Sequence, residues 1–272
     1  MSASTPSPYQ LESVERALKV LDCFQGDQAE LRLIDISRML DISKVQALRL
    51  ATTLENHGFL SRDLRTKYYR LGMRLFQLGM VVQQQSELQR IAHPFLHELV
   101  AKSGETARLM VPDALGPTCI DLVESPRQYR VFGKLGGPRA WHAGTSPKLL
   151  FAFQSEARQE AILAQPLDRF TFDTTVDPEI LREQLMEIRA RGYHISSSDI
   201  EEGATAIAAP IFDRTGEIAA SISVSGPTDR IDETGRDRVL GWVRASAGDI
   251  SRSLGHLSSS DGHLGNSLRS RV

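Results

Sequence analysis

The sequence predicts a mixed α/β (α+β) protein in which a small N-terminal winged helix-turn-helix precedes a larger domain with a mainly antiparallel sheet. Within the first 60 residues, three segments repeat apolar residues at helical spacing, and a short hairpin pattern follows them. From position 105 onward, strand-like and helix-like segments alternate. A chain of 272 residues is long enough for two domains with cores of their own.

The composition is typical of a globular protein, with 41% hydrophobic and 24% charged residues. No apolar run reaches the roughly 18 residues that a membrane span needs, and residues 1–10 lack the basic and apolar pattern of a secretory signal. We therefore expect a cytoplasmic protein with no membrane partner. Two cysteines, Cys23 and Cys119, do not make a disulfide framework, and with scattered histidines they predict neither a metal site nor a cofactor.

The helices of the first domain are predicted from apolar spacing and from residues that begin and end helices. The first is expected over 11–24 and the second over 33–40, and Asp41-Ile42 forms the turn after it. A third helix begins at Ser43 and runs to about position 56. Gln46 lies three residues after Ser43, which is the spacing of a capping box.

The third helix should pack inward through a small apolar set, namely Ala47, Leu48, Ala51 and Leu54. Two short strands, 59–63 and 67–71, then surround a polar tip, Leu64-Arg65-Thr66. Two helices joined by a tight turn and followed by a hairpin are the pattern of a winged helix-turn-helix, whose last helix enters the DNA major groove.

Charge supports this interpretation, although the whole chain carries a formal charge of −2. Between positions 43 and 74 seven basic residues face only two acids, a local balance of +5, which is either a nucleic-acid footprint or a solvated basic surface. The candidate DNA-binding residues lie at the start of the third helix and along the hairpin: Ser43, Lys44, Val45, Gln46, Arg49, Arg62, Arg65, Thr66 and Lys67. Arg49 and Gln46 suit base edges or phosphates, and Lys44 suits phosphate.

A mostly helical connector over 75–99, broken near His93-Pro94, leads to the second domain. Strands are predicted there over 106–111, 118–123, 129–135, 193–197, 204–213 and 217–225, the last two joined by a turn at Thr215-Gly216. Helices are predicted over 146–153, with Pro147 at its first position, over 178–191 and over 231–254. The expected division is 1–80 for DNA binding, 81–100 as a linker, 101–256 for the second domain and 257–272 as a disordered tail.

Several short stretches, taken in order, resemble one family of transcription factors, the isocitrate-lyase-regulator (IclR) family. They include Ile42-Ser43-Lys44, Gly58-Phe59-Leu60, Leu135-Gly136-Gly137, the stretch from His142 to Lys148, Glu201-Glu202-Gly203, the stretch from Ile207 to Asp213 and the stretch from Ser223 to Pro227. The resemblance covers about residues 11–254. It implies a GAF-like effector domain, binding to a double-stranded DNA operator as a homodimer or homotetramer, and small organic acids as effectors.

The chain departs from the family pattern at positions that bear on specificity. Val45-Gln46 stands where the recognition helix often has Ser-Thr, which concerns the operator sequence rather than the binding mode. Ser196 and Ala206 stand where members that bind very small keto acids have Asp and Cys. This loss of a charge and a thiol predicts a different effector, larger or less polar.

The effector site is predicted around Thr145-Ser146-Pro147, where a hydroxyl residue before Pro suggests an N-cap and a helix start that attracts a carboxylate. Ser223 and Ser225 lie two apart on one strand and face the same side. The resemblance places both stretches around one pocket. The other candidates are Val131, Phe132 and Trp141 as apolar lining, Ser196, Ala206, and Arg139, which either contacts the acid or, as we favour, lies in a surface loop.

Two alternatives to an effector-controlled DNA-binding protein stay open at this point. In one, the second domain binds a ligand and the N-terminal helices make only protein contacts. In the other, Ser146 with Lys148, or Cys119 with His142, forms a hydrolase site. The motifs that usually accompany a nucleophilic serine, a catalytic zinc or a phosphate loop are not present in the sequence, so we do not expect an enzyme.

Overall fold

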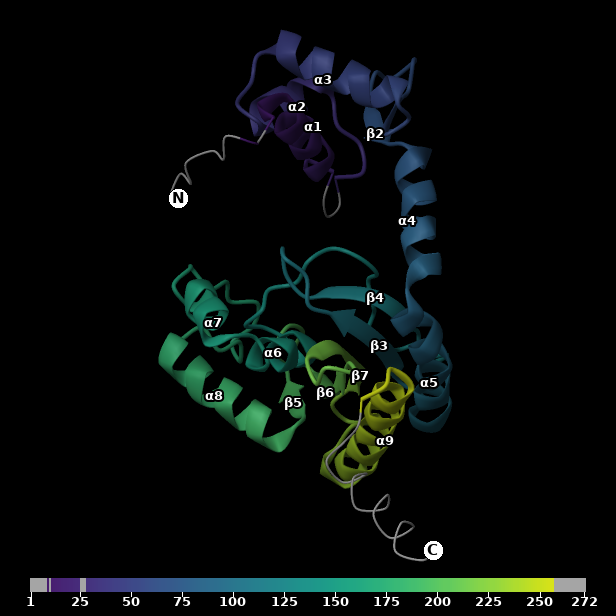
Figure 1. Ribbon diagram of the computed structural model, residues 1–272, viewed down its shortest axis with the longest axis vertical. Helices are drawn as coiled ribbons and strands as arrows, with labels where there is room; N and C mark the ends of the chain where they lie inside the picture. Colours follow the sequence, from purple (N-terminus) through teal and green to yellow (C-terminus); the bar gives the residue numbers. More distant parts are fainter. Residues whose placement is uncertain (1–8, 10, 25–27, 257–272) are drawn as a thin grey trace, which may run out of the picture. The chain divides into compact units, whose positions relative to one another are not determined.

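The computed structural model describes residue 9 and residues 11–24 and 28–256, and the chain divides into two compact units, 1–86 and 87–272 (Figure 1). The predicted tail, 257–272, lies outside the described residues. The predicted fold class is confirmed, because helices combine with an antiparallel sheet. None of the helices in the described part of the chain has the length and apolar character that crossing a bilayer requires.

The first unit has a small core between three helices and a hairpin. Its elements are α1 (Glu12–Asp22), α2 (Leu33–Met39), α3 (Lys44–Asn56), β1 (Leu60–Arg62), β2 (Tyr69–Leu71) and α4 (Met73–Gln85). Val20 of α1, Ile36 of α2 and Ala51 of α3 meet the hairpin residues Leu60 and Tyr69 in that core. The order of elements agrees with the helix-turn-helix and hairpin predicted from the sequence.

One inward position of α3 was predicted wrongly. Ala47, Ala51 and Leu54 are buried, but Leu48 is 44% exposed, and Leu50 packs partly against the core instead. The reason is geometric, since a step of one residue turns the side chain by about 100° around the helix axis.

The connector is two helices, and its break differs from the predicted one. The break falls at Ser86, between α4 and α5 (Glu87–Ser103), whereas Pro94 lies inside α5. Ala92, Leu96 and Leu99 of α5 are fully buried against the sheet of the second unit. This packing stabilises the helix despite the hydrogen bond that the proline removes.

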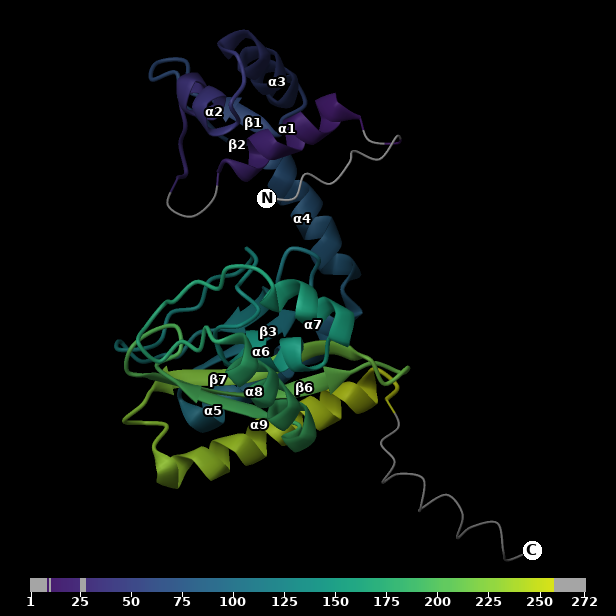
Figure 2. The same cartoon turned by 90° about the vertical axis from the view of Figure 1, so that its left-hand side faces the viewer.

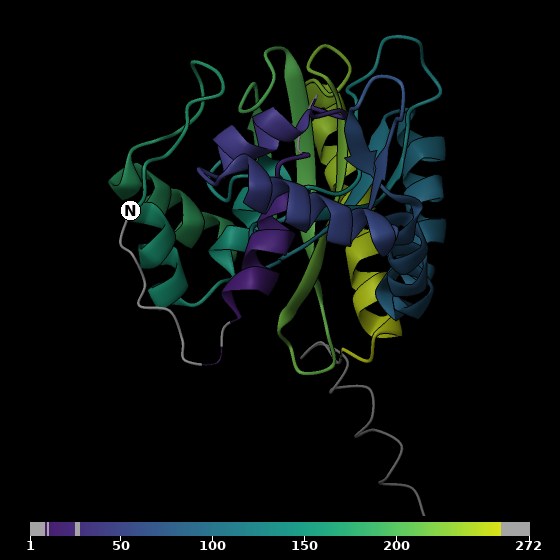
Figure 3. The ribbon, with the colours of Figure 1, turned by 90° about the horizontal axis from the view of Figure 1, so that it is seen from above.

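The second unit is built on one five-stranded antiparallel sheet in the order β4-β3-β7-β6-β5. Its strands are β3 (Thr106–Val111), β4 (Thr118–Val123), β5 (His194–Ser197), β6 (Ala204–Phe212) and β7 (Ile218–Pro227). Its further helices are α6 (Thr145–Ala152), α7 (Glu156–Leu163), α8 (Pro178–Arg191) and α9 (Glu233–Ser253). Helices α5 and α9 cover one face of the sheet, and α6, on which α8 packs, covers the other (Figures 2 and 3).

Three local predictions for the second unit need correction. Residues 129–135 form no strand but a loop, which continues into Gly136 and Gly137, both of which have a positive φ. Helix α7 was not predicted, because its apolar residues are too few to give a strong helical pattern. Helix α6 begins at Thr145, so Pro147 is its third residue and not its first. The turn at Thr215-Gly216 is confirmed, with Gly216 at a φ of 82°.

A β-bulge interrupts the pairing of β3 with β4. Cys119 pairs with Met110 and Asp121 pairs with Leu109, so Ile120 is an extra residue in β4. Residues two apart normally face the same side of a sheet, and an extra residue reverses this. Cys119 therefore belongs to the face covered by α6, and Asp121 to the face covered by α5.

Candidate functional site

The first helical turn of α3 is held by a reciprocal cap. The Ser43 hydroxyl accepts the N–H of Gln46 at 3.2 Å, and the Gln46 side-chain oxygen accepts the N–H of Ser43 at 3.3 Å. This confirms the predicted capping box, and it uses the oxygen of Gln46 within the protein. Lys44, Val45 and Arg49 are exposed on the outer surface of the helix.

The hairpin tip is shaped by Asp63. Its carboxylate accepts the N–H groups of Thr66 at 2.9 Å and Arg65 at 2.8 Å, and these hydrogen bonds lower the pKa of Asp63. Lys67 follows with a positive φ of 64°. The side chains of Arg65, Thr66 and Lys67 are therefore presented together at an exposed, ordered turn.

Arg62 differs from the other predicted hairpin residues. Its guanidinium lies 5.3 Å from the ring centre of Tyr69, and its Nε is buried without a hydrogen-bond partner in the described chain. Arg62 thus packs on the hairpin core, whereas Arg65 and Lys67 extend into solvent.

A cavity of about 450 Å³ lies in the second unit beside the start of α6. Most of the effector-site candidates line it: Val131, Arg139, Thr145, Ser146, Ser196, Ala206, Ser223 and Ser225. Phe132 lines it as well. Trp141 does not; its ring packs 5.8 Å from that of Phe151 and beneath the guanidinium of Arg158, so its predicted place in the lining is wrong.

The start of α6 differs in detail from the predicted cap. Gly144, with a φ of 89°, is the N-cap, and neither Thr145 nor Ser146 occupies that position. Within the described chain, the peptide N–H groups of Thr145 and Ser146 have no acceptor, and Pro147 has no N–H. Two donors therefore remain at the positive end of the helix dipole.

Buried hydroxyl groups surround this helix end. Ser146 and Ser225 are each at least 96% buried, and neither hydroxyl has a hydrogen-bond partner among the described residues. The Thr145 hydroxyl is paired with that of Ser196 at 2.6 Å. Buried polar groups normally have partners, so two unpartnered hydroxyls facing one cavity indicate a place for a polar ligand.

Arg108 of β3 also lines the cavity and is not among the predicted lining residues. Its guanidinium donates to the Phe132 carbonyl at 2.6 Å, while Nε has no partner and no carboxylate within the described chain forms an ion pair with it. Burial lowers the pKa of Arg108, although arginine stays protonated in proteins. The only sequence signal was a charged residue between the buried strand residues Ala107 and Leu109.

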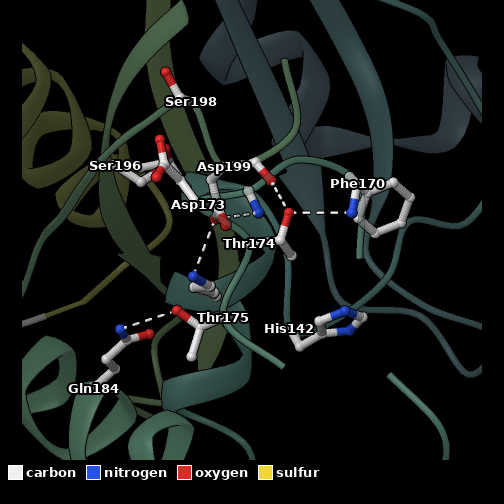
Figure 4. Close-up of polar contacts among 12 residues, drawn as sticks. His142, Phe170, Asp173, Thr174, Thr175, Gln184, Ser196, Ser198 and Asp199 are labelled. Atoms are coloured by element: carbon white, nitrogen blue, oxygen red, sulfur yellow. Dashed lines mark hydrogen bonds and ion pairs between the residues drawn. The ribbon is translucent and has the colours of Figure 1, made fainter. Parts of the chain in front are cut away.

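Asp199 joins the cavity wall to the buried side of α6. Its carboxylate accepts the Gly144 N–H at 2.7 Å and pairs with Lys148 at 3.1 Å. Its carbonyl accepts the Thr174 hydroxyl, as Figure 4 shows. Burial, assisted by the charge of Lys148, lowers the pKa of His194 in β5 to about 3, so this ring is neutral near pH 7.

Neither pair proposed for a hydrolase is in contact. Lys148 is engaged by Asp199, and the Ser146 hydroxyl has no base within hydrogen-bond distance in the described chain. His142 donates its Nε2–H to the Asp168 carbonyl, and burial raises the pKa of Cys119, which keeps it a thiol. A nucleophile needs an adjacent base or a lowered pKa, and this site provides neither.

Comparison with known proteins agrees with this architecture. Residues 13–64 match the family model for the IclR helix-turn-helix domain, and residues 80–252 match that for the bacterial transcriptional regulator IclR C-terminal domain. The chain belongs to the IclR family. It is a transcriptional regulator with a helix-turn-helix DNA-binding domain and an effector-binding C-terminal domain.

The IclR relatives include curated regulators and solved structures. The transcriptional regulator BhcR of Paracoccus denitrificans is 34% identical over 224 residues, which cover 82% of this chain and 80% of BhcR. XynR of Escherichia coli is 31% identical, with 82% of this chain and 89% of XynR covered. An IclR homologue from Microbacterium hydrocarbonoxydans, crystallised with 4-hydroxybenzoate, is 26% identical with a TM-score of 0.77, over 89% of this chain and 99% of that one.

Proposed function

We propose that this IclR-family regulator binds its operator through α3 and the hairpin tip, and that a small organic carboxylate in the cavity of the second unit controls that binding. Residues 1–80 would bind DNA, 81–100 would connect, and 101–256 would bind the effector. For DNA, the proposed contacts come from the exposed groups at the start of α3 and at the hairpin tip, above all Lys44, Arg49, Arg65 and Lys67.

The effector's negative charge is the best supported part of this proposal. The observation that carries it is the convergence of unpartnered donors on one cavity: the N–H groups that begin α6, the hydroxyls of Ser146 and Ser225, and the Nε of the Arg108 guanidinium. Donors without acceptors at a helix N-terminus favour an anion. A carboxylate would satisfy several of them at once.

The remainder of the cavity supports an effector with an apolar or aromatic body. Met110, Val131, Phe132 and Phe170 contribute apolar surface to its lining. A volume of about 450 Å³ is within the usual range for small-molecule sites. The homologue that binds 4-hydroxybenzoate has the same architecture, and an aromatic acid of that kind combines one carboxylate with one flat apolar ring.

Ser225→Ala is expected to weaken effector binding by about 10- to 150-fold, because one hydrogen bond to a charged group is worth roughly 1.5–3 kcal/mol. The measurement is calorimetric titration of aliphatic and aromatic carboxylates, beginning with benzoate and 4-hydroxybenzoate. Ser221→Ala is the matched control, since Ser221 lies on the same strand, is fully buried and unpartnered, and does not line the cavity. Equal affinity of wild type and Ser225→Ala would refute the anion site.

We also propose that a second copy of this chain packs on α4. None of the residues of this 13-residue helix is buried. Its large apolar side chains include Met73, Phe76 and Val82, which are each at least 65% exposed. Operators with two-fold symmetry are bound by two-fold symmetric proteins, which makes another copy the fitting occupant.

Light scattering at micromolar concentration should therefore show a dimer or tetramer. The variant Phe76→Glu/Val82→Glu should shift the protein toward smaller species, because two charges in an apolar interface have no partners. Gln83→Glu, which adds charge on the same helix at an already polar position, should not. A monomeric wild-type protein would contradict this proposal.

A further inference from the structure

Two histidines on the outer surface of α5 lie one helical turn apart. His93 and His97 have their Nε2 atoms 3.2 Å from each other, and the ring centres are 4.7 Å apart. Both rings are exposed, with the His93 side chain 51% accessible. Two nitrogen ligands bound to one tetrahedral ion at 2.0–2.1 Å are themselves about 3.3 Å apart, so the observed separation is close to that of a metal-chelating pair.

The second nitrogen of His93 is held by a buried carboxylate. Its Nδ1 lies 2.8 Å from Oδ2 of Asp121, a residue that is only 6% exposed. An N–H at Nδ1 that donates to a carboxylate leaves the lone pair on Nε2, directed at His97. Histidines that bind metals usually have this arrangement, in which a carboxylate fixes the tautomer and raises the basicity of the ring.

The bulge in β4 explains why this carboxylate reaches α5. Without the extra residue Ile120, Asp121 would face the same side of the sheet as Cys119, which lines the effector cavity. With it, Asp121 faces α5 and orients His93. The β-bulge thus positions the Asp121 carboxylate to contact His93. A histidine that was merely solvated on the surface would need no such buried partner.

We infer that His93 and His97 form a surface site for a divalent transition-metal ion that prefers imidazole, such as Zn²⁺ or Ni²⁺. The ion would take the place of the proton shared between the two Nε2 atoms, with the proton of His97 moved to its Nδ1. No group of three or more ligating side chains surrounds one point in the described part of the chain. The site therefore offers two protein ligands and leaves the other coordination positions to water.

The test is calorimetric titration of the untagged full-length protein with ZnCl₂ and, separately, with NiCl₂ at pH 7.5. One saturable site per chain is expected. His97→Ala should abolish it, and Asp121→Asn should weaken it by about 10- to 100-fold, the usual cost of losing a carboxylate that orients a ligand. His57→Ala, which removes an exposed histidine from the first unit, is the matched control and should leave the affinity unchanged.

Affinity should also fall when the pH is lowered from 7.5 to 5.5, because protons compete for imidazole. His97 is exposed, so His97→Ala should retain the wild-type circular dichroism spectrum even if Asp121→Asn, which alters a buried group, does not fold. Metal affinity of His97→Ala equal to that of wild type, or no saturable binding by wild type, would overturn the inference. The experiments on effector binding and operator binding involve other residues, so their results do not decide whether His93 and His97 bind a metal ion.

Discussion

Replacing Arg49, Arg65 and Lys67 together by alanine is expected to weaken operator binding by at least about 100-fold at physiological salt. Each such contact is worth roughly 1–3 kcal/mol, and 1.4 kcal/mol corresponds to a factor of ten. All three side chains are exposed, and for the described residues none of them forms an ion pair that would neutralise it, whereas Arg70 is paired with Glu30. Mobility shift or fluorescence anisotropy on the native operator measures the loss.

A control variant with the same change in net charge separates the effect of losing local DNA contacts from the effect of a lower net charge on DNA affinity. Arg90, Lys102 and Arg191 are exposed residues of the second unit, each in an ion pair along its own helix. Their triple alanine variant should bind DNA nearly as the wild type does. The plot of log affinity against log salt should become less steep by up to about three units only in the first variant. If the Arg49/Arg65/Lys67 triple alanine variant bound the operator as tightly as the wild type, the alternative in which the N-terminal helices make only protein contacts would be favoured.

Asp199→Ala is expected to lower the free energy of unfolding of the second unit by about 3–5 kcal/mol, because it leaves the Lys148 ammonium buried without its partner. Both side chains are only 4% exposed, so water does not replace the lost carboxylate. Urea unfolding followed by circular dichroism measures the change. Glu187→Ala is the control, since it breaks the exposed ion pair with Arg191, which should cost less than about 1 kcal/mol.

The double variant Lys148→Met/Asp199→Asn tests the cause of that loss. It removes both charges, while the amide oxygen at position 199 still accepts the Gly144 N–H that precedes α6. Most of the stability should return, because paired charges replaced together by neutral groups leave none unsolvated. A cost of Asp199→Ala no larger than that of Glu187→Ala would show that the ion pair has no such role.

Local chemistry made much of the fold predictable. The cap formed by Ser43 and Gln46 and the turn at Gly216 depend on residues that are near each other in the chain, so the sequence contains all of the relevant information. The break in the connector was misplaced because a proline usually ends a helix. Here the apolar contacts of α5 with the sheet, which involve distant residues, outweigh that local preference.

The proposed effector cavity was predictable only in part, and for the same reason. Ser146 and Ser225 could be named because a helix start and a pair of strand serines are visible in the sequence. Arg108 was missed, since a charged residue in a strand usually faces solvent. The partner of Lys148 lies 51 residues away, at Asp199, and no spacing rule connects them. Only the packing of α6 on the sheet brings these two residues together.

If the proposed carboxylate effector binds at the start of α6, the proline at the third position of this helix limits which acids the site can accept. A helix N-terminus that receives a phosphate commonly offers three successive peptide donors, but here the third residue is Pro147 and only Thr145 and Ser146 contribute. Two adjacent donors match the two oxygens of a planar carboxylate. A tetrahedral oxyanion would direct a third oxygen at the pyrrolidine ring, where it loses its hydration and gains no hydrogen bond. In the proposed site, the shape of the anionic group, in addition to its charge, would thus be a criterion for recognition.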